Sequence, residues 1–202
     1  MPKPNSVLIV FKAPPPRVPK ILHEEVGRMF PRKNIPLITG TRYLTLPQDQ
    51  DPLSALIHAW HMPQGLGRTF MHDVPKALAQ CELVLVEALG LSVFAEIAHN
   101  LPADAPDREE TLSRLLVVHQ ALVQAYMQEA KIAAKIVYLV FGTRAKSEAY
   151  YNQYLGVLGQ KMHRVPSHES DLDIARFAAA VIGDIAHEHG IHNNTSRLHV
   201  AA

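Results

Sequence analysis

Two copies of Gly-Thr-Arg are the first residues whose types and spacing could do chemistry. One copy, 142–144, ends the apolar run "KIVYLVF", and the other, 40–42, ends "IPLIT". Glycine after a strand lets the backbone approach a ligand, threonine offers a hydroxyl group, and arginine binds phosphate through a forked pair of N–H donors. Where such a strand leads into a helix, the free N–H groups of the helix also attract anions. The pattern predicts an anion site.

The first apolar run, "SVLIVF", ends in similar chemistry, with Lys12 after it and Arg17 and Lys20 at the start of the next helix. If this strand and the strand 135–141 run parallel and side by side, their cations face one crevice. The predicted phosphate-binding residues are Lys12, Arg17, Lys20, Arg42, Thr143, Arg144 and Lys146. The alternative is ordinary turn chemistry with hydrated arginines, and neither copy has a phosphate-loop or dinucleotide fingerprint.

Histidines and one aspartate form a second constellation in "HAWHMPQGLGRTFMHDVPKA", namely His58, His61, His72 and Asp73. The segment "MHDVPKA" is similar to the central helix of the HD phosphohydrolases, a family that holds one or two metal ions through a His-Asp pair. The resemblance implies a divalent metal bound by His72 and Asp73, with His58 or His61 assisting. It is confined to this segment, and the upstream histidines stand closer than that family places them. The alternative is that Asp73 caps a helix and the histidines lie at the surface.

Other titratable residues have structural interpretations. "AEIAH" (95–99) and "GDIAH" (183–187) each place an acid three residues before a histidine, as metal-binding bundles do. Both copies fall at predicted helix ends, where the helix dipole already favours a cationic histidine. His119 lies on the apolar stripe of a predicted helix, which indicates a buried, hydrogen-bonded side chain. The single cysteine, Cys81, excludes an internal disulfide framework and suits a reducing compartment.

The composition limits the class of protein that can hold these residues. The chain has 202 residues, 48% hydrophobic and 19% charged, with a net charge of +1. These values exclude a disordered chain and predict one globular domain over 1–190, with a loose His-containing tail at 191–202. Neither a signal-peptide pattern nor a long uncharged apolar stretch is present, so we expect a cytoplasmic protein with no membrane partner. Basic and acidic blocks alternate along the chain. Such blocks can steer a charged partner, or blocks of opposite charge can pack beside each other within the fold.

The elements that must position the candidate residues follow from the apolar pattern. The convincing strands are predicted at 6–12 and 135–141, with shorter extended segments at 35–38, 42–46 and 164–166. Helices are predicted over approximately 20–30, 53–62, 73–99, 107–131, 146–162 and 170–189. The fold class is therefore α/β (or α+β), with a small mixed sheet of three to five strands, a helical middle section at about 50–131, and about half the chain in helices. The β-α units at the two ends of the chain are expected to lie side by side.

These observations predict a cytosolic phosphate-recognising protein that binds nucleic acid or a nucleotide in an accessory or regulatory role, with no required cofactor. Its affinity is expected to fall as salt rises. One alternative is a metal-dependent phosphohydrolase that uses the His-Asp pair. The other is a protein–protein adaptor or homodimer, which predicts neither phosphate binding nor bound metal.

Overall fold

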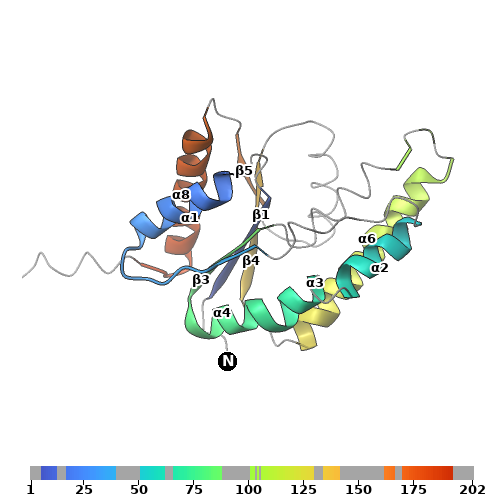
Figure 1. Ribbon diagram of the computed structural model, residues 1–202, viewed down its shortest axis with the longest axis horizontal. Helices are drawn as coiled ribbons and strands as arrows, with labels where there is room; N and C mark the ends of the chain where they lie inside the picture. The colour runs from blue at the N-terminus through green and yellow to red at the C-terminus, as the bar shows by residue number, and fades with distance from the viewer. Residues whose placement is uncertain are drawn as a thin grey trace, which may run out of the picture.

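The computed structural model describes residues 6–12, 17–39, 51–61, 66–87, 101–102, 104, 106–129, 134–141, 162–166 and 170–192. Within these residues the chain forms one sheet with helices on both of its faces (Figure 1). Of the predicted site, Arg42, Thr143, Arg144 and Lys146 lie outside the described residues. The segments 42–46 and 193–202, and almost all of the helix predicted at 146–162, also lie outside them.

The sheet has five strands in the order β2-β3-β1-β4-β5. All four neighbouring pairs are parallel. The strands are β1 (Val7–Lys12), β2 (Leu37–Ile38), β3 (Leu83–Glu87), β4 (Lys135–Phe141) and β5 (Met162–Val165). The predicted α/β class is confirmed, and the sheet is parallel in its described strands rather than mixed. The predicted adjacency of β1 and β4 is also confirmed, with Lys12 opposite Val140.

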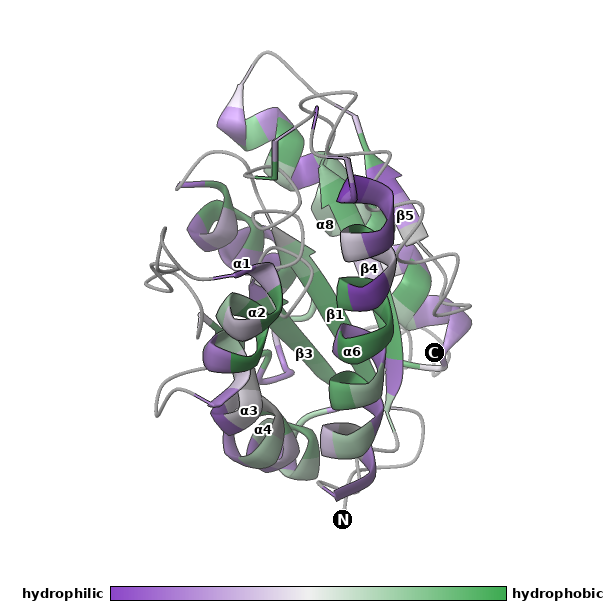
Figure 2. Ribbon diagram, turned by 90° about the vertical axis from the view of Figure 1, so that its right-hand side faces the viewer, coloured by the Kyte–Doolittle hydropathy of each residue, from purple (hydrophilic) through white to green (hydrophobic). Residues whose placement is uncertain are grey.

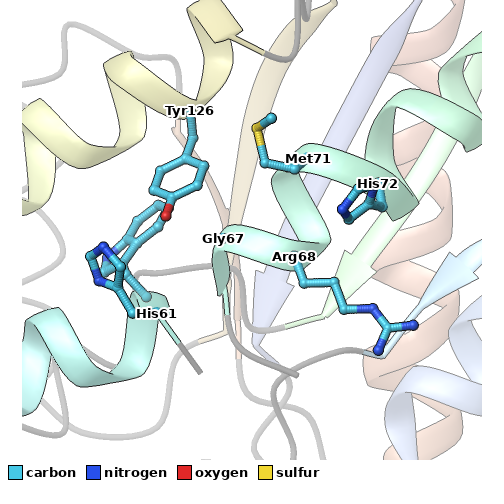
Figure 3. Close-up of a pocket in the computed structure, with 7 residues that line it drawn as sticks. His61, Gly67, Arg68, Met71, His72 and Tyr126 are labelled. Atoms are coloured by element: carbon cyan, nitrogen blue, oxygen red, sulfur yellow. The ribbon is translucent and has the colours of Figure 1, made fainter. Parts of the chain in front are cut away.

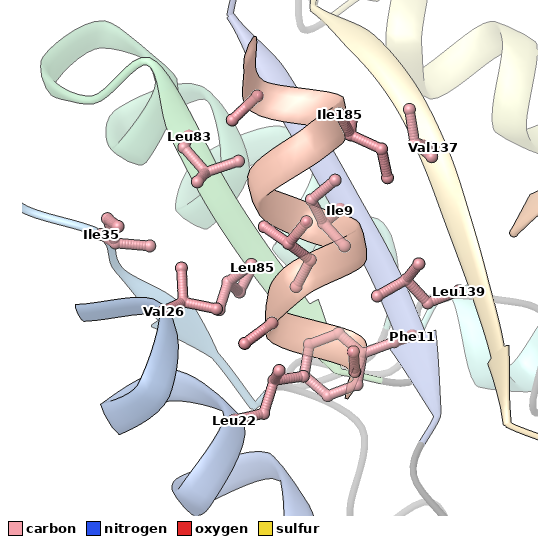
Figure 4. Close-up of a cluster of buried hydrophobic side chains, with 14 of the residues drawn as sticks. Ile9, Phe11, Leu22, Val26, Ile35, Leu83, Leu85, Val137, Leu139 and Ile185 are labelled. Carbon is pink, nitrogen blue, oxygen red and sulfur yellow. The ribbon is translucent and has the colours of Figure 1, made fainter. Parts of the chain in front are cut away.

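Each strand of the sheet centre is apolar on both sides because both sides are covered. Residues 7, 9 and 11 of β1 belong to a core cluster with α1 (Val18–Met29) and α8 (Asp171–Glu188). Residues 8 and 10 belong to a second cluster with α2 (Pro52–His61), α4 (Val74–Gln80) and α6 (Arg108–Glu129). Figure 2 shows the hydrophobic strands lying behind α2 and α6, and Figure 4 shows α8 packed across β1, β3 and β4. Continuous apolar runs are typical of parallel strands covered in this way.

Helix ends form where the sequence supplies capping residues. The Ser170 hydroxyl oxygen accepts from the Asp173 amide at 3.2 Å and so begins α8, which ends before Gly190 at φ 72°. Asp51 begins α2 by accepting from the amides of Leu53 and Ser54, both at 3.1 Å. Hydrogen bonds from Ser54 are the main cause of a lowered pKa for the Asp51 carboxyl group. These caps confirm the predicted starts of both helices.

Two predictions for the middle of the chain are wrong. The helix predicted over 73–99 ends at Gln80, and β3 follows at Leu83–Glu87 between β2 and β1. The supposedly helical middle section therefore contributes a central strand. Asp73 does not cap a helix, because it lies within a continuous helical segment and its side chain makes no capping hydrogen bond. That segment consists of α3 (Leu66–Arg68), the π-helical turn η1 (Thr69–Asp73) and α4.

Among the described residues, no helix has the length and apolar character that crossing a membrane requires.

Candidate functional site

The carboxyl ends of β1, β3 and β4 meet at one edge of the sheet. Phe11 lies opposite Glu87 of β3, and Lys12 lies opposite Val140 of β4. Helix α1 begins at Val18, only a short connection after Lys12. Since parallel strands all end at the same edge, the end of β1 and the ends of its two neighbours lie together near the start of α1, where open α/β sheets have their ligand-binding crevice.

Among the described elements, the next helices after β1 and after β3 cover opposite faces of the sheet. After β1 the next described helix is α1, which packs with α8 on one face of the sheet. After β3 the next described helix is α6, which covers the other face. Open α/β sheets bind ligands at such switch points, because the diverging connections leave the strand ends accessible. The geometry therefore favours the crevice between β1 and β3 as the candidate site.

Positive charge gathers at the start of α1. Arg17 directly precedes the helix and Lys20 lies in its first turn, and both side chains are exposed. The first turn contains no acidic residue. The positive end of the helix dipole therefore adds to two cations, an arrangement that attracts anions.

The same turn is poor in backbone donors. Pro19 occupies one of the first two positions of α1, and the connection from β1 has the sequence "APPP". Proline has no N–H group, so this connection cannot cradle a phosphate with consecutive backbone amides as a glycine-rich loop does. An anion at this turn would therefore have to be held by side-chain cations rather than by consecutive backbone amides.

The structure brings together part of the predicted phosphate-binding set. Lys12 ends β1, and Arg17 and Lys20 lie at the adjacent start of α1. The strand β4 ends at Phe141, beside the end of β1. The contribution of the other four residues, Arg42, Thr143, Arg144 and Lys146, stays a prediction.

Sequence reasoning missed Glu87 as a member of this edge. Its side chain is only 7% exposed, and its backbone lies beside Phe11 at the end of β3. The run "LVLVE" is consistent with a buried strand that ends in an acid, but its pattern alone does not distinguish it from a segment of buried helix. At this edge β3 thus ends in an acidic residue, whereas β1 ends in a basic residue.

The predicted metal-binding set does not form a cluster. His58 and His61 are exposed on α2, and the imidazole Nδ1 of His61 is 2.8 Å from the carbonyl oxygen of Ile57. His72 is exposed on η1, and Asp73 is half-buried beside it. No group of three or more His, Cys, Asp or Glu side chains among the described residues is arranged to hold a metal ion. The geometry gives no support to the phosphohydrolase alternative.

His119 is the buried core residue that its sequence position predicts. Its imidazole Nδ1 accepts a hydrogen bond from the Trp60 indole N–H at 3.3 Å, and the two rings lie 5.4 Å apart. Burial lowers the pKa of His119 to about 3, because the charged form would lose its hydration. The ring is neutral at physiological pH and serves as a structural partner of Trp60.

Comparison with known proteins gives a fold and no family. No protein-family model matches the sequence, and no curated protein matches it at a significant level. A thymidylate kinase from Ehrlichia chaffeensis superposes with a TM-score of 0.57 at 13% identity, covering 89% of this chain and 98% of that one. A de novo designed protein with the P-loop NTPase fold gives a TM-score of 0.44 at 12% identity, covering 93% and 99%. The chain thus shares its overall fold with a thymidylate kinase.

Proposed function

We propose that this protein binds a nucleotide at the carboxyl edge of its sheet and holds the phosphate group mainly with side-chain cations. The observation that carries the proposal is the parallel adjacency of β1 and β4 beside the start of α1. In this arrangement Lys12 lies at the carboxyl end of β1, and Arg17 and Lys20 lie at the start of the helix that follows it. The fold adds support, because a protein named for a nucleotide substrate shares it.

The proline-rich connection after β1 determines which groups can hold the phosphate. A glycine-rich loop holds phosphate through many fixed backbone amides, which remain effective in salt because they are close and partly shielded from water. Exposed side chains such as Arg17 and Lys20 interact across water and are screened by salt. We therefore propose strongly salt-dependent recognition of a nucleotide, in an accessory or regulatory role.

A thermal-shift series tests this function. The probes are thymidylate, ATP and inorganic pyrophosphate, each at about 20 mM and about 300 mM salt, where the screening lengths differ roughly fourfold. A nucleotide at one hundred times its dissociation constant is expected to stabilise the protein by about 2.7 kcal/mol, and to do so less at high salt. If no probe raises the melting temperature at low salt, the proposal is wrong.

A pair of variants locates the binding. The double substitution Arg17→Gln with Lys20→Gln removes the two exposed cations at the start of α1, and affinity is expected to fall at least tenfold, since a hydrogen bond to a charged group contributes about 1.5–3 kcal/mol. The control is Arg32→Gln with Arg176→Gln, which removes the same charge from exposed positions after α1 and on α8. Equal losses in the two variants would show a response to net charge only and would contradict the proposed site.

A further inference from the structure

A second candidate site lies in the helical layer, away from the strand ends. An open cleft of about 520 Å³ is lined by Trp60, His61, Gly67, Arg68, Met71, His72 and Tyr126. These residues come from the end of α2, from α3 and η1, and from the last part of α6 (Figure 3). Figure 1 shows the end of α6 and helix α3 near the amino ends of the strands. The cleft is lined by residues of both elements and therefore lies on that side of the sheet. It is separate from the crevice proposed above for a nucleotide.

The π-helical turn shapes one wall of the cleft. The amide of Val74 donates to the carbonyl oxygen of Thr69, five residues earlier, instead of following the usual four-residue pattern. Pro75 follows at once, and a proline cannot donate to the carbonyl group of residue 71 and would crowd it in a regular α-helix. The wider turn accommodates the absence of the hydrogen bond that Pro75 cannot make, and Met71 and His72 of this turn line the cleft. Such π turns occur frequently at functional sites.

The opposite wall is held rigidly from behind. The Trp60 ring stacks on the Tyr126 ring with centroids 5.1 Å apart and planes at 23°, and its indole N–H is bonded to His119 in the core. Trp60 is 1% exposed, so Tyr126 is the aromatic surface that a ligand meets. Gly67 brings α3 against this pair: a Cβ atom there would lie 2.8 Å from the Tyr126 hydroxyl oxygen. The cleft is therefore preformed.

The charge of the cleft is one-sided. None of its seven lining residues is acidic. Arg68, His72 and Lys76 follow one another at four-residue intervals along the helical segment 66–80, and all three are exposed. Among the described residues none of the three is held in an ion pair. This row is thus available to an anion from solution.

Arg68 and His72 occupy one end of the cleft, and Tyr126 occupies the other (Figure 3). Figure 3 shows Arg68 and His72 extending on one side of the helical segment, with His61 and Tyr126 on the other and Met71 between them. A ligand that contacts all of them must carry its charge at one end and a less polar body at the other. A phosphate monoester fits the cationic end better than a carboxylate, because its second negative charge matches a row of several cationic or protonatable groups.

We propose that this cleft binds an organic phosphate monoester with a ring-shaped body, the phosphate at Arg68 and His72 and the ring against Met71 and Tyr126. The proposal goes beyond the nucleotide crevice and does not depend on it. The guanidinium group of Arg68 supplies two parallel N–H donors to the phosphate oxygens. The polarizable thioether of Met71 and the ring of Tyr126 bury the ligand body.

Phenyl phosphate is the probe, with titration calorimetry for affinity and fluorescence as the site reporter. Trp60 is the only tryptophan of the chain and lies directly behind Tyr126, so its emission reports occupancy of this cleft. We expect saturable one-to-one binding that changes Trp60 emission and is tighter than binding of inorganic phosphate or benzoate. Absence of saturable binding at low salt overturns the proposal, as does equal affinity for inorganic phosphate.

Matched variants make the assignment specific. Arg68→Gln and His72→Gln alter exposed side chains, so the fold is expected to persist, and each is expected to weaken phenyl phosphate about tenfold, or about 1.4 kcal/mol. Arg176→Gln, an exposed arginine on α8, is the control and should leave the affinity unchanged. The double variant of Arg17 and Lys20 should also leave it unchanged. A loss in that double variant would place the probe in the strand-end crevice and overturn this proposal.

Discussion

The helices on the two faces of the sheet form two different kinds of core. On the face of α1 and α8 the described core is continuous and apolar, running from Leu22 and Val26 across the strands to Ile182 and Ile185 (Figure 4). On the face of α2, α4 and α6 the core is interrupted by polar features. The buried side chains of His119 and Thr69, the π turn and the open cleft all occur there. One face chiefly stabilises the sheet, whereas the other also carries an open cleft.

The largest expected effect separates stability from binding. Ile182→Ala removes a fully buried side chain of α8 and should lower the free energy of unfolding by about 2–5 kcal/mol. Because Ile182 lies on the face away from the cleft, Trp60 emission in the native state and phenyl phosphate affinity should stay unchanged. Urea unfolding and the fluorescence titration measure the two quantities. A change in ligand affinity in the folded variant would show that the two faces are coupled.

Substitutions of two glycines, one on each face of the sheet, should change stability by an intermediate amount and in opposite directions. Gly67→Ala places a Cβ atom 2.6 Å from the Trp60 carbonyl oxygen, which is overpacking of the kind that costs about 1–3 kcal/mol. The matched control is Gly27→Ala in α1, where a Cβ atom meets nothing within 4 Å and alanine should stabilise the helix by up to about 1 kcal/mol. Thermal unfolding measures both variants. Similar shifts of the melting temperature would contradict the difference in packing between the faces.

The smallest effect is a dependence of stability on pH. Because burial lowers the pKa of His119 to about 3, the unfolded chain binds a proton near pH 6.5 that the folded chain does not. The unfolding free energy should therefore fall as pH falls from 6.5 toward 3, with about 1 kcal/mol lost between pH 7 and 5.5 from this residue.

The variant His119→Gln isolates this contribution. A glutamine still offers an acceptor to the Trp60 indole N–H but does not titrate. Urea unfolding at pH 7.0, 6.0 and 5.5 should show a shallower loss of stability in the variant than in the parent. Parallel curves would mean that His119 is protonated or hydrated in the folded state.

The sequence predicts the scaffold well and the cleft poorly. The runs at β1 and β4 are long and β-branched, and α8 carries both a serine cap and a terminal glycine, so local patterns suffice for these elements. The strand β3 was missed because "LVLVE" is short and buried on both sides, which gives no alternation to distinguish it from a helix. Its position between β2 and β1 is a property of the whole sheet.

The candidate sites show the same limit. Lys12, Arg17 and Lys20 follow a strand end and a helix start, so their convergence at one edge follows from recognising the β-α unit. In the cleft, Gly67 packs against the stacked rings of Trp60 and Tyr126, and no local sequence pattern predicts this contact. Pro75 was the available signal for an irregular helix, but proline in a first turn is equally compatible with an ordinary start.

The central position of β1 has a consequence for biosynthesis. Neither of its hydrogen-bonding partners, β3 and β4, is the strand that follows it in the sequence. Val7, for example, pairs with Lys135 of β4, which is synthesised much later. At about 5–20 residues per second, the ribosome supplies β4 on the order of ten seconds after β1. During that interval the apolar segment "VLIVF" lacks at least one of its two sheet partners, so folding during synthesis is expected to benefit from chaperones that bind exposed apolar segments.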